Sequence, residues 1–219
     1  MQTVMRGARL AALAVGVLAG SALAATTAAA QTVTLGAVLN GAQERPTPVT
    51  TTGFGFGQLT YNQATDLVTV SLTVRNLTSN TVAVGAGGSS GHVHVVTMAN
   101  GNGPIALPLV NAATLTADAA LLGVRGFDYA QSFTFAQIGS ITGLDQTALG
   151  LLRTRLIAAI GAPQGTGVAA YFNVHTTAFP AGEIRGDLAV VPEPSTYALL
   201  GTGLAGLGLA ARRRRAVKA

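Results

Sequence analysis

The sequence predicts an all-β fold, an antiparallel β-sandwich with one short helix, framed by two apolar ends. Three observations predict it. Val and Thr, which suit a pleated and half-buried surface, are frequent, and 28 glycines supply turn positions. Apolar and polar side chains alternate over residues 66–77 with the period of two of a strand. Short strands separated by frequent turns, with a single helical pattern near residues 149–160, are typical of a sandwich.

Residues 1–30 have the features of a secretory signal. Arginines near the start precede an apolar run, and small residues follow. The small-x-small pattern, with Ala28 and Ala30 as its small residues, predicts cleavage by signal peptidase before Gln31; residues 22–24 are a second candidate site. An uncleaved anchor helix is the alternative, which the small residues disfavour.

The first predicted strands lie within residues 32–77. An apolar-rich strand covers residues 32–39, and the strands 53–61 and 66–77 are joined by turn-forming residues, which predicts a hairpin. In 53–61, glycines alternate with phenylalanines and the apolar phase then changes, which predicts a bulge near Gly57.

The second half of the domain holds more strands and the helix. Residues 85–91 are rich in Gly and Ser and predict a flexible loop. The helix is predicted to be capped by Asp145 and to end at Gly161 and Pro163. The further predicted strands are 92–98, 105–110, 132–135, 168–176 and 183–190.

Residues 191–219 form a second address segment. A rigid break at 191–195 is followed by the uncharged stretch 195–211, which as a helix would span about 25 Å, slightly under a hydrocarbon core of about 30 Å. The basic end, 212–219, would stop transfer and stay inside the cell. A buried core helix is the alternative, but it does not explain the arginines. The break begins with Val191, Pro192, Glu193 and Pro194, and the stop is Arg212, Arg213, Arg214 and Arg215.

The net charge of +5 belongs to the ends and not to the domain at 31–190. Between Gln31 and Val191 there are six arginines, no lysine and seven acidic residues. A domain without a basic patch lacks the electrostatic attraction that dominates nucleic-acid binding, so no nucleic-acid partner is expected. The absence of Cys excludes disulfides and thiolate metal sites.

The three histidines are the candidate metal ligands. His92 and His94 are two residues apart on a predicted strand, so they point the same way, and His175 lies on another strand. Three imidazoles suit copper or zinc. The alternative is that the histidines hydrogen-bond to neighbouring strands or loops and bind no cofactor. No catalytic triad, phosphate loop or carboxylate pair is visible, so no enzymatic activity is expected.

Residues 171–188 read as a hairpin with a polar face. Glu183, Arg185 and Asp187 share one face of its second strand and predict an exposed charge ladder, worth about 0–1 kcal/mol. Glu44 and Arg45 are interpreted as a polar strand end before a proline turn, with a contact to a partner as the alternative.

Two parts of the sequence resemble known families. The tail from Val191 to about Lys218 is similar to a PEP-CTERM sorting signal. That resemblance implies export by a Gram-negative bacterium that makes exopolysaccharide. It also implies a transient stay in the inner membrane and cleavage near Pro192-Glu193-Pro194 by an exosortase-type protease.

The body, over residues 33–190, resembles the CHRD domain. The resemblance rests on the opening at residues 39–46, on Gly91-His92-Val93-His94 and on a C-terminal signature; residues 113–130 show no match. The His-x-His element is also similar to that of copper–zinc superoxide dismutases, whose ligands are more numerous. The signature residues are Asn173, His175, Thr176, Gly182, Glu183, Ile184, Arg185 and Gly186.

These features together predict a non-enzymatic binding or structural module of the cell surface or extracellular matrix, with exopolysaccharide or surface proteins as partners. A copper- or zinc-binding extracytoplasmic protein is the alternative.

Overall fold

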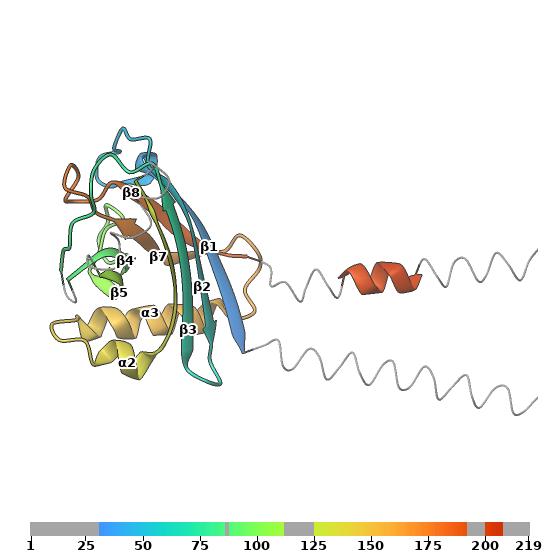
Figure 1. The fold of residues 1–219 in the computed structure, drawn as a ribbon. Helices are drawn as coiled ribbons and strands as arrows, with labels where there is room; N and C mark the ends of the chain where they lie inside the picture. Colours follow the sequence, from blue (N-terminus) through green and yellow to red (C-terminus); the bar gives the residue numbers. More distant parts are fainter. Residues whose placement is uncertain (1–30, 86–87, 112–124, 192–199, 208–219) are drawn as a thin grey trace, which may run out of the picture.

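The structure, a computed structural model, describes residues 31–85, 88–111, 125–191 and 200–207. Figure 1 shows a curled sheet with two short helices across its lower end. The strands are β1 (Thr32–Asn40), β2 (Phe54–Asn62), β3 (Leu67–Arg75), β4 (Ser89–Val95), β5 (Ile105–Asn111), β6 (Phe127–Thr134), β7 (Gly167–Val174) and β8 (Ile184–Val190). A 3-10 turn, η1 (Gly41–Gln43), follows β1.

The fold is all-β and antiparallel, as predicted, but it is not two packed sheets. All eight strands belong to one sheet in the order β5-β4-β7-β8-β1-β2-β3-β6. The sheet curls into a nearly closed barrel, and the apolar side chains of its inner face form one core. The first and last strands, β1 and β8, pair with each other in the middle of the sheet. Alternation alone could not predict this pairing of strands that are far apart in the sequence.

The β2–β3 hairpin is confirmed, but the bulge predicted near Gly57 is wrong. The pairing of β2 with both neighbours runs without interruption from Phe54 to Asn62. Gly57 faces inward, on the same side as Leu59 and Tyr61, and Phe54 and Phe56 face outward. The ring of Phe172 occupies the space where a side chain of Gly57 would lie, since an added Cβ would be 2.5 Å from it. Gly57 therefore marks a close approach between β2 and the ring of Phe172 on β7, and the alternation of inward and outward side chains continues through it.

The predicted helix is α3 (Gln146–Ala159), and Asp145 caps it by accepting from the backbone N–H of Thr147 and Ala148. A second helix, α2 (Phe135–Gly139), was not predicted; it begins where the strand 132–135 was expected to end. Thr134 and Gln137 form a capping box at its start, a signal that the sequence does carry. Apolar residues of both helices complete the core.

β4, residues 170–174 of β7 and residues 184–186 of β8 differ from the rest of the barrel because both of their faces are buried. Val93, Phe172 and Ile184 point into the core and are fully buried. The opposite face carries polar side chains that are also buried, including His92, Asn173 and Arg185. The loops before β2, before β5 and before β8 lie over this polar outer face and contribute partners to it. A second, polar core therefore exists outside the barrel.

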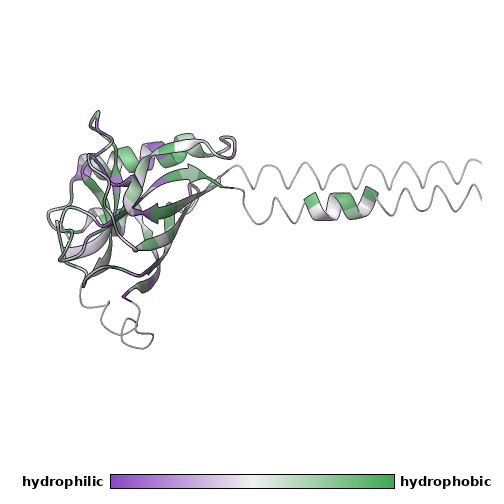
Figure 2. Cartoon of the chain, turned by 90° about the horizontal axis from the view of Figure 1, so that it is seen from above, coloured by the Kyte–Doolittle hydropathy of each residue, from purple (hydrophilic) through white to green (hydrophobic). Residues whose placement is uncertain are grey.

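Part of the C-terminal address is described. Residues 200–207 form an exposed helix whose residues are either hydrophobic or intermediate in hydropathy (Figure 2). Among the described residues, no helix has the length and apolar character needed to cross a membrane. The remaining residues of the predicted span 195–211 lie outside the described residues, as do Pro192, Glu193, Pro194 and Arg212–Arg215, and the signal segment 1–30 with Ala28 and Ala30.

Candidate metal centre

The three histidines come together on the polar outer face. His92 and His94 alternate along β4, and His175 directly follows β7, the strand that pairs with β4. The register places Asn173 opposite His92 and Tyr171 opposite His94. One ring nitrogen from each histidine lies within 4.8 Å of those of the other two. The predicted cluster is thus a property of strand pairing, because each ring is positioned by the backbone ladder.

A backbone carbonyl fixes the tautomer of each histidine. Nε2 of His92 is 3.1 Å from the carbonyl oxygen of Val84, Nδ1 of His94 is 2.9 Å from that of Gly103, and Nδ1 of His175 is 3.0 Å from that of Pro180. A carbonyl can only accept, so the bonded nitrogen carries the hydrogen and the other nitrogen carries the lone pair.

The three lone pairs have no partner. Nδ1 of His92, Nε2 of His94 and Nε2 of His175 are buried atoms without a hydrogen bond. Buried polar atoms in folded proteins are nearly always hydrogen-bonded or bound to an ion or ordered water. Three imidazole lone pairs in one buried cluster are acceptors only, and a cation is the group that satisfies all of them together.

Burial keeps the histidines neutral. Desolvation lowers the pKa of His92 to about 3, with further lowering by His175 and His94. It also lowers the pKa of His94 to about 4 and lowers the pKa of His175. At neutral pH the imidazoles therefore carry no proton that a metal ion would have to displace.

The geometry fits copper or zinc with a small contraction. Ring nitrogens around tetrahedral zinc, with Zn–N of about 2.0–2.1 Å, are about 3.3 Å apart. The histidine nitrogens, which lie within 4.8 Å of one another, would have to move closer to reach this spacing. The carbonyl bonds are outer partners of the kind that orient metal-binding histidines. Three protein ligands leave a fourth position open. The fully buried hydroxyl of Ser90, on the same face of β4, also lacks a partner and was missed from the sequence.

An aromatic stack connects the histidine cluster with Arg185. The rings of His94 and Tyr171 are stacked, 4.8 Å apart and 4° from parallel, and the guanidinium of Arg185 lies 3.5 Å from the centre of the Tyr171 ring. Arg185 is 2% exposed and bonds Asp187, the carbonyl of Gly101 and the side chain of Asn102.

Glu44 is buried, which corrects its interpretation as a polar strand end. It is 6% exposed, and its Oε2 accepts a hydrogen bond of 3.3 Å from the amide of Asn173. Burial raises the pKa of Glu44 to about 7, although Arg185 and Asn173 act in the opposite direction. Gly182, at φ +136°, approaches so closely that an added Cβ would lie 2.8 Å from both side chains.

The exposed charge ladder predicted for β8 is also wrong. Glu183 is fully buried and binds three threonines, and only Arg185 and Asp187 form an ion pair. The loops over the polar outer face bury Glu183 and Arg185, whereas the side chain of Asp187 is 47% exposed. Alternation within one strand carries no information on such a cover. Of the other signature residues, Thr176 bonds Glu183, Ile184 belongs to the core, and Gly186 packs against Leu39 and Val38 of β1.

The loop predicted at 85–91 is in part a strand. Ser89, Ser90 and Gly91 belong to β4 and are buried, whereas residues 86–87 lie outside the described residues. At the other end, Gln31 precedes β1, and Val191 donates its backbone N–H to Thr34, so the described part of the sorting motif continues the sheet.

Comparison with known proteins agrees with the sequence signatures. The profile of the CHRD domain matches residues 35–188, and that of the PEP-CTERM protein-sorting motif matches residues 190–215. No curated protein and no solved structure matches the chain. A PEP-CTERM motif implies export to the cell surface and processing by an exosortase, and neither family is an enzymatic one. Since the first match covers most of the chain, from the opening of β1 to the end of the signature in β8, this protein belongs to the CHRD domain family.

Proposed function

We propose that this exported protein is a non-enzymatic module of the cell surface or extracellular matrix that binds one copper or zinc ion through His92, His94 and His175. Two observations carry the proposal: the three histidines each bring one ring nitrogen within 4.8 Å of those of the other two, and each has one buried ring nitrogen without a hydrogen-bond partner. A purely structural role would need one hydrogen bond from each ring, and those bonds are already made to Val84, Gly103 and Pro180. The remaining nitrogens are left for a ligand.

The surroundings support a bound ion more than a reaction centre. The histidines are at most 9% exposed, and the buried carboxyl of Glu44 is held by Asn173. The ion would tie β4 to the end of β7 and to the loops that end at Gly103 and Pro180. We expect it to stabilise the polar outer face, as ions do when they bind the folded state alone.

The addresses complete the proposed role. Signal peptidase removes residues 1–30, the inner membrane holds the intermediate through the tail, and an exosortase cleaves near Pro192-Glu193-Pro194. The released domain then associates with exopolysaccharide or with surface proteins. The support for this route is the PEP-CTERM match over residues 190–215.

The test uses variants that keep each carbonyl bond and remove each lone pair. In His175→Asn and His94→Asn the amide nitrogen replaces Nδ1, and in His92→Gln it replaces Nε2, so the bonds to the loops survive. The exported protein is purified, incubated with Cu²⁺ or Zn²⁺ and analysed for bound metal by mass spectrometry. We expect one ion in the native protein and in the surface control Gln58→Ala, and at least a tenfold loss of affinity in each histidine variant.

The electron paramagnetic resonance spectrum of the copper form gives a second readout, because nitrogen ligands split its signal. A folded native protein that takes up neither metal, or histidine variants that retain it at full affinity, would refute the proposal and leave the histidines with a structural role.

A further inference from the structure

A cavity opens on the same side of the barrel where the pairing of β7 and β8 is interrupted. Gly167 pairs with Ala189, and the next pair joins Tyr171 to Asp187, so β7 has more residues than β8 between the two pairs. The extra residues bow away from β8 and leave a cavity of about 470 Å³. Irregular pairing of this kind is frequent beside binding sites, and the volume lies in the range of small-molecule pockets, about 300–1,000 Å³.

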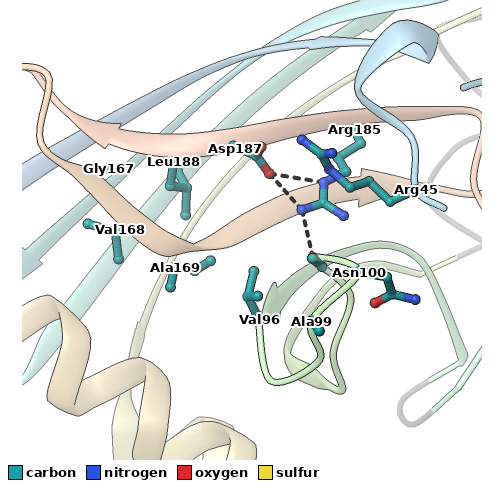
Figure 3. A pocket seen from close by; sticks show the side chains of 12 residues that line it. Arg45, Val96, Ala99, Asn100, Gly167, Val168, Ala169, Arg185, Asp187 and Leu188 are labelled. Atoms are coloured by element: carbon teal, nitrogen blue, oxygen red, sulfur yellow. Dashed lines mark hydrogen bonds and ion pairs between the residues drawn. The ribbon is translucent and has the colours of Figure 1, made fainter.

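One end of the cavity carries two guanidinium groups. Figure 3 shows Arg45 and Arg185 next to each other, with Asp187 bonded to Arg185. Both come close to one point beside Gly101, where an added Cβ would lie 3.3 Å from Nε of Arg45 and 3.7 Å from Nη2 of Arg185. Gly101 has φ +86° and no side chain, which leaves room for the side chain of Arg45.

The two arginines differ in how they are held. Arg185 is fixed by Asp187, Gly101, Asn102 and the face of Tyr171. Arg45 is exposed, and no ion pair joins it to a carboxylate in the part of the chain that the structure describes.

The charge around the cavity is positive. Arg155 adds a third guanidinium, because it donates to the carbonyl oxygens of Ala169 and Val96, which line the cavity. The facing acids are Asp187, which is occupied by Arg185, and Glu44, which is buried and bonded to Asn173. Two guanidiniums line the cavity and a third, that of Arg155, lies behind its wall, whereas the two nearby carboxylates both have partners.

The other side of the cavity is apolar. Val168, Ala170 and Leu188 line it from the bowed strands, although their side chains belong to the barrel core and are at most 9% exposed. Val96 also lines the cavity and is partly exposed. An apolar wall with a few convergent polar groups is the usual composition of a ligand pocket.

We propose that this cavity binds a small organic carboxylate, with its carboxylate on the free guanidinium of Arg45 and its body on the apolar wall. A guanidinium presents two parallel N–H groups that match a carboxylate, and this pairing is stronger than a hydrogen bond between neutral groups. Arg185 adds positive charge beside it but has its own donors occupied. The site is separate from the proposed metal centre and does not depend on a bound ion.

The test measures binding to the exported protein by chemical-shift changes in NMR spectra. The probes are glucuronate, a sugar acid, and hexanoate, an aliphatic acid, with glucose and hexanol as their uncharged counterparts. We expect at least one acid to bind with a Kd of about 1 mM or tighter, corresponding to about 4 kcal/mol, and to shift backbone signals of residues 99–101 and 168–170. The acid that binds identifies the body that the wall accepts.

The variants assign the carboxylate contact. Arg45→Gln should weaken binding of that acid by about tenfold, and Arg125→Gln, which removes an arginine bonded to Thr78 elsewhere on the barrel, should leave it unchanged. Added salt should weaken binding to Arg45, because an exposed guanidinium is screened. Three results would overturn the proposal: no binding of either acid, equal binding of the uncharged counterpart, or an Arg45→Gln protein that binds as the native one does.

Discussion

Glu183 should be the most sensitive single charge in the domain. Its carboxylate is fully buried and accepts four hydrogen bonds: 2.6 Å from Oγ1 of Thr51, 2.8 Å from both N and Oγ1 of Thr78, and 2.7 Å from Oγ1 of Thr176. These donors belong to the loops before β2, after β3 and after β7. Removal of the carboxylate therefore leaves several buried donors unsatisfied at the point where the three loops meet.

The magnitude follows from the bonds. Burial alone would raise the pKa of Glu183, but the bonds from Thr176, Thr51 and Thr78 outweigh it and lower the pKa, so the ionised form is stabilised in the fold. Hydrogen bonds to a charged group are worth about 1.5–3 kcal/mol each when both partners are considered, and breaking a buried charged network costs about 3–5 kcal/mol. We expect Glu183→Ala to lose about 4 kcal/mol. Glu183→Gln keeps one oxygen for three of the donors and should lose about 2 kcal/mol.

The assays are urea denaturation and thermal denaturation of the native protein and both variants at pH 7. Thermal midpoints should fall by about 2–4 °C for each kcal/mol in a domain of this size. The matched control is Arg75→Ala, which removes an ion pair with Asp128 whose side chains are 30% and 55% exposed, and it should cost less than about 1 kcal/mol. If Glu183→Ala unfolds as the control does, the four bonds contribute little and the reasoning is refuted. A lowered pKa also means that this stabilisation is present above pH 4.5 and is lost as the pH falls below it.

Two further outcomes follow from buried groups. In the metal-free protein, His92 and His94 have pKa values below the unfolded value of 6.5. Because the unfolded chain then binds more protons below that pH, the two histidines lower the free energy of unfolding by about 4 kcal/mol between pH 7 and pH 5. Glu44 has a raised pKa, so it acts in the opposite direction and adds about 2 kcal/mol of stability over the same interval. The urea midpoint should therefore fall more steeply with acid in Glu44→Gln than in the native protein. Parallel pH profiles of the two proteins would contradict this. Gly57→Ala should destabilise the barrel by about 1–3 kcal/mol, because its methyl group meets the ring of Phe172. Adding Phe172→Leu to the same chain should recover part of the loss in thermal midpoint. A Gly57→Ala protein as stable as the native one would show that the ring is free to move.

Local patterns predicted the elements better than their assembly. Alternation found β3, the turn after β2 predicted the hairpin, and Asp145 marked the start of α3, because each signal is contained in neighbouring residues. The single curled sheet depends on the pairing of β1 with β8, which lie at opposite ends of the domain sequence. That choice is decided by packing across the barrel, and nothing in the strands themselves separates one curled sheet from two stacked ones.

The candidate site was predicted in part for the same reason. His92 and His94 share a face by strand periodicity alone, and the addition of His175 required only that β7 pair with β4. The burial of Glu44, Glu183 and Arg185 could not be predicted, since it depends on loops that cross over the outside of the sheet. Strand alternation indicates which side chains share a face but not whether that face meets water.

The pairing of β1 with β8 also decides how the two ends of the barrel differ. The two strands are antiparallel, so Thr32 and Val191, where both address segments join the domain, lie at one end of the barrel. His92 is in register, through Asn173 and Arg185, with Asn40 at the opposite end of β1. The histidine cluster therefore lies toward the end of the barrel that is remote from the points where the two address segments join it.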